Sequence, residues 1–281
     1  MKILVVGATG VLGRHVIPRL LERGHAVRAL VRRPEQQAEP LTRLGAESAP
    51  GDILDPASLL AAAHGYDAVL HLATAIPKPG GARDWSRNDR VRREGTANLL
   101  AAARATGVRR YVQQSIIFLY GDQGQSIATE ATPLNPAPFI QSASDMEDRV
   151  RASDRDWCIL RGGAFYGPGT GAEDGWYQAA RAGTLRLPGD GAGLTSLIHV
   201  VDMAQSVVLA TEKARPSTTY NVVDDEPVSY RTLYTHIAAS IGAAHPTPGG
   251  PPTRSLGCSN ARLRAELGWT PAYPTYRSGL I

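Results

Sequence analysis

The sequence predicts an α/β fold, in which a doubly wound parallel sheet (Rossmann type) is accompanied by a smaller C-terminal lobe that binds substrate. Strand-like apolar runs alternate with helical patterns through the first part of the chain. A glycine-rich segment, Gly7-Ala8-Thr9-Gly10-Val11-Leu12-Gly13, lies between the first strand and the first helix. With 281 residues and 43% hydrophobic content, the chain is long enough to bury a large core.

The glycine-rich segment has the features of a nucleotide site. Residues 3–6 form an apolar run typical of a buried parallel strand, and apolar residues recur at helical spacing after Val11. Spaced glycines allow a tight turn, close approach of the backbone to a pyrophosphate, and close packing of helix on strand. The N–H groups at the start of the helix face the phosphates. We therefore expect these residues to bind cofactor: Gly7, Thr9, Gly10, Val11, Leu12 and Gly13.

The end of the second predicted strand, residues 26–31, indicates which dinucleotide is bound. NAD-binding folds place an acidic residue here to hold the ribose 2′-hydroxyl, whereas an arginine accommodates a 2′-phosphate. In this chain Val31 is followed by Arg32 and Arg33. The sequence therefore predicts NADP(H), with a solvated basic turn before Pro34 as the alternative.

Further elements continue the alternation. Residues 47–50 precede a helix capped near Asp55, and 68–73 form a buried strand. Ligands of open α/β sheets bind at the carboxyl ends of strands, so Ala73, Thr74 and Ala75 should lie beside the nicotinamide ribose. The Pro- and Gly-rich residues 76–89 are predicted to form a lid loop.

The rest of the chain is predicted in shorter pieces. The nucleotide-binding domain should span residues 1–168, rejoined by about 196–223, and the substrate lobe should comprise 169–195 and 224–281. Residues 246–252, rich in Pro and Gly, are expected to form a mobile connector. The remaining predicted helices are 92–105, 139–152, 176–182, 202–212, 230–241 and 261–267, and the remaining strands are 111–117, 157–161, 185–188 and 220–223.

Composition excludes several classes of partner. The 30 basic and 26 acidic residues are spread along the chain with no basic block, so no nucleic-acid partner is expected. Cys158 and Cys258 lack metal-ligand spacing and a disulfide framework, so no metal is expected. Because the first predicted strand begins directly at the start of the sequence, no signal peptide is expected, and no apolar run reaches membrane-spanning length. The expectation is a cytoplasmic protein with a small-molecule substrate and no membrane partner.

A set of short motifs is spread along the whole chain: Gly7 to Gly13, Gly51-Asp52, Gly95-Thr96, Tyr120-Gly121, Arg161, Tyr166-Gly167-Pro168-Gly169, His199-Val200-Val201-Asp202, Asn221 and Leu267-Gly268-Trp269-Thr270-Pro271. Together they resemble the extended, or atypical, short-chain dehydrogenases/reductases of the NAD-dependent epimerase/dehydratase type. The resemblance implies that Asp52, with Ile53 beside it, faces the adenine amino group, although a helix-capping carboxylate is the alternative for Asp52. It also suggests a homodimer formed through helices that flank the sheet.

The polar groups that this family uses for proton transfer are missing. Family members carry a Tyr-x-x-x-Lys pair on the helix after the fifth strand and a Ser or Thr at the end of that strand. The resemblance places Phe139, Ala143 and Ile116 at these positions, with Ser115 one residue early and facing the other way. Independently of any alignment, none of the three lysines (Lys2, Lys78, Lys213) follows a tyrosine by four residues.

Four residues are candidates to replace the missing groups. Tyr120 and Tyr166 belong to motifs in which an aromatic residue is common, so packing is the alternative role for both. His199 lies near Asp202 and forms either a histidine–carboxylate couple or an ordering contact of the substrate lobe. Arg92 falls on the family's asparagine position, where it could hold an anionic or carbonyl group; the alternative is a surface arginine paired with Glu94.

The sequence thus predicts an NADP(H)-dependent oxidoreductase that acts on a small aromatic or polycyclic carbonyl or quinone compound. Proton transfer would come from a substitute residue, water or the substrate, since hydride transfer to a quinone or conjugated enone demands less from a general acid. Two alternatives remain open: a non-redox cyclase, isomerase or lyase that uses NADP as a scaffold, and a non-catalytic NADP(H)-sensing protein.

Overall fold

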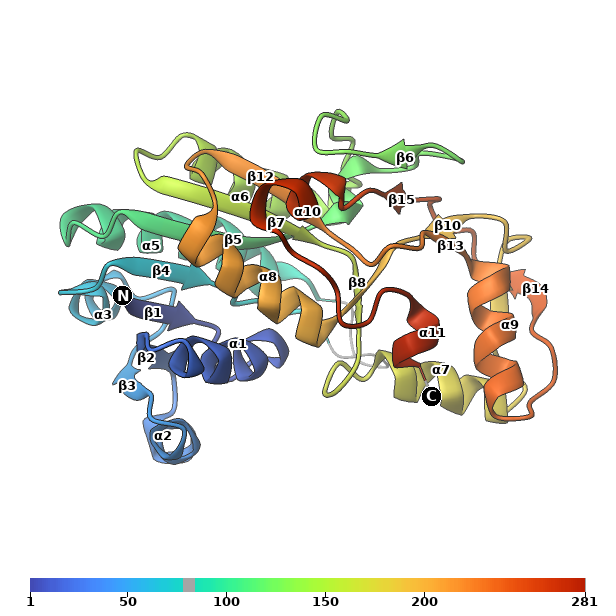
Figure 1. Cartoon of the computed structure of the whole chain (residues 1–281), viewed down its shortest axis with the longest axis horizontal. Coiled ribbons are helices and arrows are strands. Elements are labelled where there is room, and N and C mark those ends of the chain that lie inside the picture. Colours follow the sequence, from blue (N-terminus) through green and yellow to red (C-terminus); the bar gives the residue numbers. More distant parts are fainter. Residues whose placement is uncertain (78–83, 281) are drawn as a thin grey trace. The chain divides into compact units, whose positions relative to one another are not determined.

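A computed structural model describes residues 1–77 and 84–280 of the chain (Figure 1). Part of the predicted lid loop, residues 78–83, lies outside the described residues. The chain forms two compact units. Unit 1 comprises Met1–Ser115, Ala137–Leu160 and Ala204–Thr219, and unit 2 comprises Ile116–Pro136, Arg161–Met203 and Tyr220–Ile281. The chain passes from one unit to the other after Ser115, Pro136, Leu160, Met203 and Thr219.

A seven-stranded sheet is the framework of unit 1, and it confirms the predicted Rossmann-type fold. Its strand order is β12-β7-β5-β4-β1-β2-β3. Strand β1 pairs in parallel with β2 and β4, β2 with β3, and β4 with β5. The order reverses direction after β1, which is the switch point where such sheets bind ligands. The strands are β1 (Lys2–Val6), β2 (Ala26–Val31), β3 (Glu47–Pro50), β4 (Ala68–His71), β5 (Arg110–Ile116), β7 (Asp156–Gly162) and β12 (Thr218–Val222).

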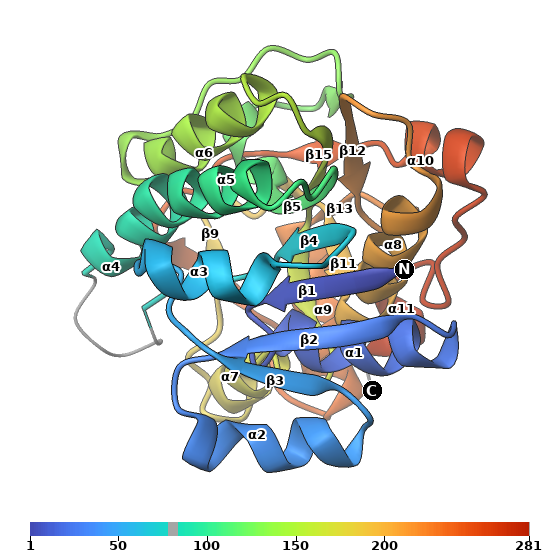
Figure 2. The same cartoon turned by 90° about the vertical axis from the view of Figure 1, so that its left-hand side faces the viewer.

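Helices cover both faces of this sheet, because its central strands are apolar on both sides. Helices α3, α5 and α6 lie on one face and α1 and α8 on the other, while α2 packs along strands β2 and β3 (Figure 2). The helices of unit 1 are α1 (Val11–Glu22), α2 (Pro34–Arg43), α3 (Pro56–Ala63), α4 (Ser86–Arg90), the π-helical turn η1 (Val91–Gly95), α5 (Thr96–Ala105), the 3-10 turn η3 (Pro138–Ile140), α6 (Gln141–Arg151) and α8 (Val200–Lys213), whose first turn belongs to unit 2.

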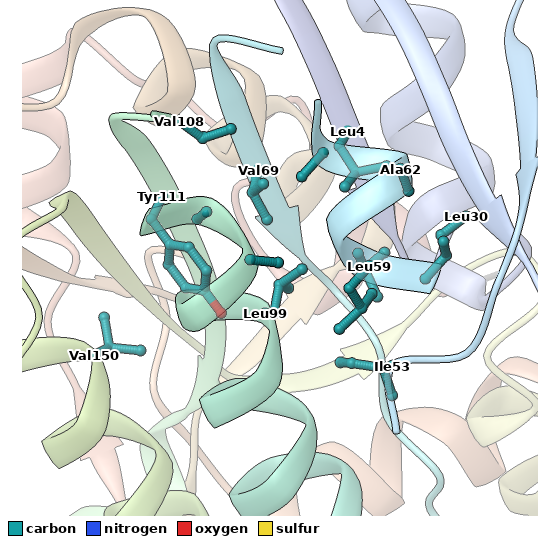
Figure 3. Close-up of a cluster of buried hydrophobic side chains, with 14 of the residues drawn as sticks. Leu4, Leu30, Ile53, Leu59, Ala62, Val69, Leu99, Val108, Tyr111 and Val150 are labelled. Carbon is teal, nitrogen blue, oxygen red and sulfur yellow. The ribbon is translucent and has the colours of Figure 1, made fainter. Parts of the chain in front are cut away.

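The core of unit 1 forms between the sheet and the α3, α5 and α6 face. Side chains from separate stretches of the sequence meet there, including Leu4, Leu59, Leu99 and Tyr111, all fully buried (Figure 3). The Tyr111 hydroxyl donates a hydrogen bond to Gln113 Oε1 at 3.3 Å, which satisfies its polar tip inside the core. This core fixes the strand ends that carry the predicted cofactor residues.

Unit 2 is built from short strands in two-stranded sheets and from helices. The pairs are β6 with β15, β8 with β11, β9 with β14 and β10 with β13. Two buried clusters hold it together, one around Tyr166 and Tyr276 and one around Tyr120 and Leu256. Its elements are the 3-10 turn η2 (Ile117–Tyr120), β6 (Ile127–Ala128), β8 (Ala164–Tyr166), α7 (Ala172–Arg181), β9 (Arg186–Pro188), β10 (Leu194–Thr195), β11 (Leu197–His199), β13 (Val228–Ser229), α9 (Tyr230–Ser240), β14 (Thr247–Gly250), β15 (Gly257–Cys258), α10 (Ala261–Leu267) and α11 (Tyr276–Gly279).

The structure differs from the sequence predictions in three places. The predicted connector 246–252 contains β14, which pairs in parallel with β9, because its backbone groups find a partner strand far away in sequence. The helix expected from residue 92 begins at Ser86 as α4 and passes through the π-helical turn η1. The fifth strand ends at Ile116 and turns into η2. In the part of the chain that the structure describes, no helix has the length and hydropathy needed to cross a membrane.

Candidate functional site

The turn from β1 to α1 can be built only with glycine at two positions. Gly7 has φ +93°, and a Cβ on it would lie 2.6 Å from the Ala73 nitrogen. A Cβ on Gly13 would lie 2.4 Å from the carbonyl oxygen of Gly7. Both distances are shorter than real Cβ contacts, so side chains here would push backbone segments apart. The turn therefore lies directly against the segment that follows β4, with Gly7 packed against Ala73.

The N-terminus of α1 has the properties of an anion site. Its N-cap is Gly10, which makes no side-chain cap, and the first turn contains no acidic residue. Thr9 and Gly10 are exposed. The N–H groups of the first turn and the positive end of the helix dipole are thus open to a phosphate. These residues fit the pyrophosphate of a dinucleotide.

The basic residues after β2 lie close to this turn. Arg32 and Arg33 are exposed, and among the described residues no carboxylate pairs with either. Gln37 on α2 accepts the Arg33 N–H at 2.9 Å, and its amide donates to Thr9 Oγ1 at 3.3 Å. Gln37 thus joins the two parts of the predicted cofactor site, and no local pattern in the sequence singled it out. Both guanidinium groups remain open to a phosphate.

The two aspartates that follow β3 have different roles. Asp55 Oδ1 accepts the Ala57 N–H at 3.1 Å and caps α3, which confirms the predicted cap. Asp52 Oδ1 accepts the Leu54 N–H at 2.9 Å within its own turn. Asp52 does not cap α3, so the capping alternative for this carboxylate is wrong. Its interaction with adenine stays a prediction.

A buried asparagine, which the sequence analysis did not single out, holds the end of β4. The Oδ1 of Asn88 accepts the Ala75 N–H at 2.9 Å, and Asn88 is fully buried on α4. Ile53 and Asn98 form a second support, in which the Asn98 amide donates to the Ile53 carbonyl at 3.2 Å. These contacts orient the strand ends at which Ala73, Thr74 and Ala75 are predicted to meet the cofactor.

The start of α6 is where the family carries its tyrosine and lysine. Phe139 is 60% exposed, and its ring centroid lies 6.3 Å from that of Trp85. Ala143, four residues on, is fully buried. Ser115, at the end of β5, donates to Glu147 Oε1 at 2.6 Å, and both residues are buried. The Ser115 hydroxyl is therefore engaged by a carboxylate of α6.

Arg92 is turned into the protein from η1 and is only 4% exposed. Its Nη1 lies 3.4 Å from Ser142 Oγ, a long hydrogen bond to the first turn of α6. Burial lowers the pKa of Arg92 to about 10, opposed in part by the charge of Asp89. Glu94 pairs with Arg90 at 2.9 Å. The alternative of a surface Arg92 paired with Glu94 is therefore wrong.

Tyr120 belongs to unit 2 and is fully buried. Its hydroxyl donates to Asn221 Oδ1 at 2.7 Å and accepts from Arg161 Nη1 at 2.8 Å. Burial raises the pKa of Tyr120 to about 12. These contacts favour the packing role that the sequence left open for this residue.

Tyr166 and His199 also belong to unit 2 and pack against each other. Their ring centroids lie 5.1 Å apart, and His199 stacks on Tyr273 at 3.7 Å. Asp202 accepts the N–H groups of Ala272 and Tyr273 at 2.8 and 2.9 Å. Burial raises the pKa of Tyr166. These contacts favour the ordering role for the segment from His199 to Asp202.

Comparison with known proteins agrees with the cofactor site. The profile of the NAD(P)H-binding family matches residues 7–186. A "3-diazoavenalumate denitrifying reductase" from a Streptomyces species is 37% identical over 100% of this chain and 99% of the relative. A "2-alkyl-3-oxoalkanoate reductase" from Stenotrophomonas maltophilia is 30% identical over 86% of this chain and 76% of the relative. The UDP-glucose 4-epimerase of Thermus thermophilus, solved with NAD, is 25% identical with a TM-score of 0.82, over 100% of this chain and 96% of that structure.

The family match, the relatives and the structure lead to the same assignment. The profile match begins at Gly7, the first glycine of the turn against β4. Both relatives are reductases, and the structural neighbour has the same strand framework with NAD bound. The chain belongs to the NAD(P)H-binding family and is an NAD(P)-dependent enzyme of the epimerase/dehydratase type of short-chain dehydrogenases/reductases.

Proposed function

We propose that this enzyme uses NADPH to reduce a small, conjugated aromatic compound by replacing a diazo group with hydrogen. The name of the Streptomyces relative, which is 37% identical over the whole chain, states both a diazo substrate and loss of nitrogen. The residues after β2 support the phosphorylated cofactor, because Arg32 and Arg33 are exposed where a 2′-phosphate would lie.

The observation that carries the proposal is the absence of any tyrosine four residues before a lysine. Reduction of a ketone creates an alkoxide, which must be protonated, and a tyrosine–lysine pair supplies that proton. Loss of N2 from an aryl diazonium needs no proton. The exposed Phe139 and buried Ala143 therefore match a reaction that has no use for the pair.

When bound, NADPH supplies the hydride that adds to the ring carbon as the C–N bond breaks, N2 leaves with the bonding electron pair, and the nicotinamide is oxidised. The protein binds the phosphates at the N-terminus of α1 and positions the strand ends through Asn88 and the glycine turn. The exposed Phe139 ring, which lies beside Trp85, would help to exclude water, which would otherwise add to the diazonium.

A conjugated carbonyl or quinone is the second candidate substrate class. The oxoalkanoate reductase that is 30% identical to this chain supports carbonyl reduction in general. In a quinone or conjugated enone the charge that hydride transfer creates is delocalised over the ring system. Such a substrate again requires less from a general acid than an isolated ketone does.

The test measures NADPH oxidation with three matched substrates: an ortho-hydroxybenzenediazonium, the corresponding quinone and an aryl ketone. Product and N2 are quantified by mass spectrometry, and reactions without protein measure the spontaneous background. We expect N2 and the hydro-arene in equal amounts, with one NADPH consumed per N2. NADPH binding without reduction of the diazonium would overturn the proposal. Quinone reduction would then support the second candidate, whereas product without NADPH consumption would indicate a non-redox enzyme.

A further inference from the structure

We propose that Arg92, together with the aromatic pair Phe139 and Trp85, forms a binding site in unit 1 for an aromatic anion. The guanidinium would hold an anionic oxygen, a carboxylate or a phenolate, while the rings hold the aromatic body. This inference rests on the proposed function, since it names a charged group that its substrate carries. Arg92 would then determine which ligand binds, without taking part in proton transfer.

Arg92 is a buried cation without an ion-pair partner among the described residues. It is 4% exposed, and its hydrogen bond to the neutral Ser142 hydroxyl is long, at 3.4 Å. Arginines at this depth are normally paired, because a buried charge is costly when nothing compensates it. A guanidinium also presents a planar fork of donors that matches a carboxylate. The group is therefore suited to an anion that comes from outside the chain.

The charged groups around Arg92 form no ion pair with it among the described residues. Asp145 bonds Arg93 Nε at 2.6 Å. The charge of Asp89 raises the pKa of Arg92, and Asp89 also lies 3.9 Å from Arg93 Nη1. His71, at the end of β4, is fully buried, and burial lowers its pKa to about 4. His71 is thus neutral near pH 7 and neither repels an anion nor supplies a second cation. Asp89 compensates the buried charge of Arg92 only in part, because burial still lowers the pKa of Arg92 to about 10.

The hydrogen bond to Ser142 directs the guanidinium toward the start of α6. Ser142 lies three residues after Phe139 and directly before Ala143. Phe139 belongs to η3, the turn that leads into α6, and Ser142 is buried in the first turn of α6. The hydrogen bond therefore places the charge of Arg92 against the segment 139–143, where the family carries its tyrosine and lysine.

The rings of Phe139 and Trp85 complete the site. Their centroids are 6.3 Å apart with the planes tilted by 52°, and Phe139 is 60% exposed. A preformed pair of aromatic rings, one exposed and one half-buried, offers a surface for a third ring. An apolar ring surface beside an unpaired cation suits an aromatic ligand with one negatively charged oxygen better than it suits an aliphatic or neutral ligand.

The test measures ligand affinity without turnover. The NADP⁺ complex is titrated by calorimetry with cinnamate and cinnamamide, and with 4-nitrophenolate and 4-nitroanisole. The two pairs separate a carboxylate from a phenolate as the preferred source of the anionic oxygen. We expect at least one anion to bind the wild-type protein roughly 10- to 100-fold more tightly than its neutral partner. Equal affinities for anion and neutral partner in both pairs would overturn the proposal without any variant.

The variants locate this preference in the structure. Arg92→Gln should remove it while leaving the neutral ligands unchanged, and Arg92→Lys should restore part of it, since the charge returns without the fork. Phe139→Ala should weaken both members of a pair equally. Arg90→Gln, which removes an exposed arginine paired with Glu94, is the matched control and should change nothing. A stable Arg92→Gln variant that keeps the full preference would also overturn the proposal.

The outcome separates this proposal from the proposed function. If the anion preference depends on Arg92 but no diazo compound is reduced, the proposed binding site is supported and the proposed reaction is overturned. If diazo compounds are reduced but anions are not preferred, the proposed reaction is supported and the proposed binding site is overturned.

Discussion

Two segments of unit 1, the turn after β1 and the start of α6, differ in what the fold requires of their side chains. At the turn after β1, Gly7 and Gly13 are required because backbone atoms occupy the space of a side chain. In η3 and at the start of α6, Phe139 and Ala143 occupy the positions of the family's acid–base pair, and both helical elements form with these residues in place. Cofactor binding thus depends on the backbone, whereas the chemistry depends on side chains. Substitutions can therefore change the reaction while the chain keeps its cofactor site.

The glycine turn should tolerate the least change. We expect Gly13→Val to lower the free energy of unfolding by roughly 3 to 5 kcal/mol, because its Cβ would lie 2.4 Å from the Gly7 oxygen, and to abolish NADPH binding. Thermal unfolding and cofactor titration measure both effects. Gly175→Ala in α7 is the control, since nothing lies within 4 Å of its added Cβ, and it should be neutral or slightly stabilising. If the Gly13→Val variant binds NADPH normally, cofactor binding does not depend on the backbone of the glycine turn.

Restoring the family's tyrosine and lysine tests the segment at the start of α6. We expect the double variant Phe139→Tyr with Ala143→Lys to gain about 100-fold or more in NADPH-dependent reduction of an aryl ketone over the wild-type background. The single changes, each of which supplies only half of the pair, serve as controls. Ala143 is fully buried, so the fold of the double variant must be checked by circular dichroism. A folded double variant without ketone reduction would mean that the surrounding residues no longer fit the family chemistry.

Changes at the arginines after β2 should have a more moderate effect, on the affinity for NADPH. We expect Arg32→Gln with Arg33→Gln to weaken NADPH binding roughly 10- to 100-fold while leaving NADH almost unchanged, because only NADPH carries the 2′-phosphate. Arg43→Gln, at the other end of α2 and paired with Glu39, is the control. Equal losses for both cofactors would contradict the assignment of NADP(H).

Stability should depend on pH through His71, at the end of β4. Burial lowers its pKa in the folded state from 6.5 to about 4, so between these values the unfolded chain binds a proton that the folded chain does not. The free energy of unfolding should therefore fall as the pH is lowered, by about 2 kcal/mol between pH 8 and pH 5 from this group. His71→Leu should flatten this slope in urea titrations at several pH values. An unchanged slope would show that other groups produce it.

The parallel sheet, its main strands and the glycine turn could be predicted because local patterns encode them. Apolar strands such as 3–6 and glycines at a strand–helix turn carry their signal within a few residues. The supports of the site could not be predicted in this way. Asn88 holds Ala75, and Gln37 joins Arg33 to Thr9, through contacts that local periodicity does not show. Arg92 bonds Ser142, which is 50 positions away in the sequence. The burial of Arg92 therefore became evident only in the structure.

Isotope transfer tests the central claim most directly: that the enzyme moves a hydride without a tyrosine–lysine pair. NADPH carrying deuterium at the transferable position is incubated with the enzyme and an ortho-hydroxybenzenediazonium, and the arene is analysed by mass spectrometry. The account predicts one deuterium at the carbon that carried the diazo group, with N2 released in equal amount. An arene that contains only solvent hydrogen, or N2 release without NADPH oxidation, would contradict it.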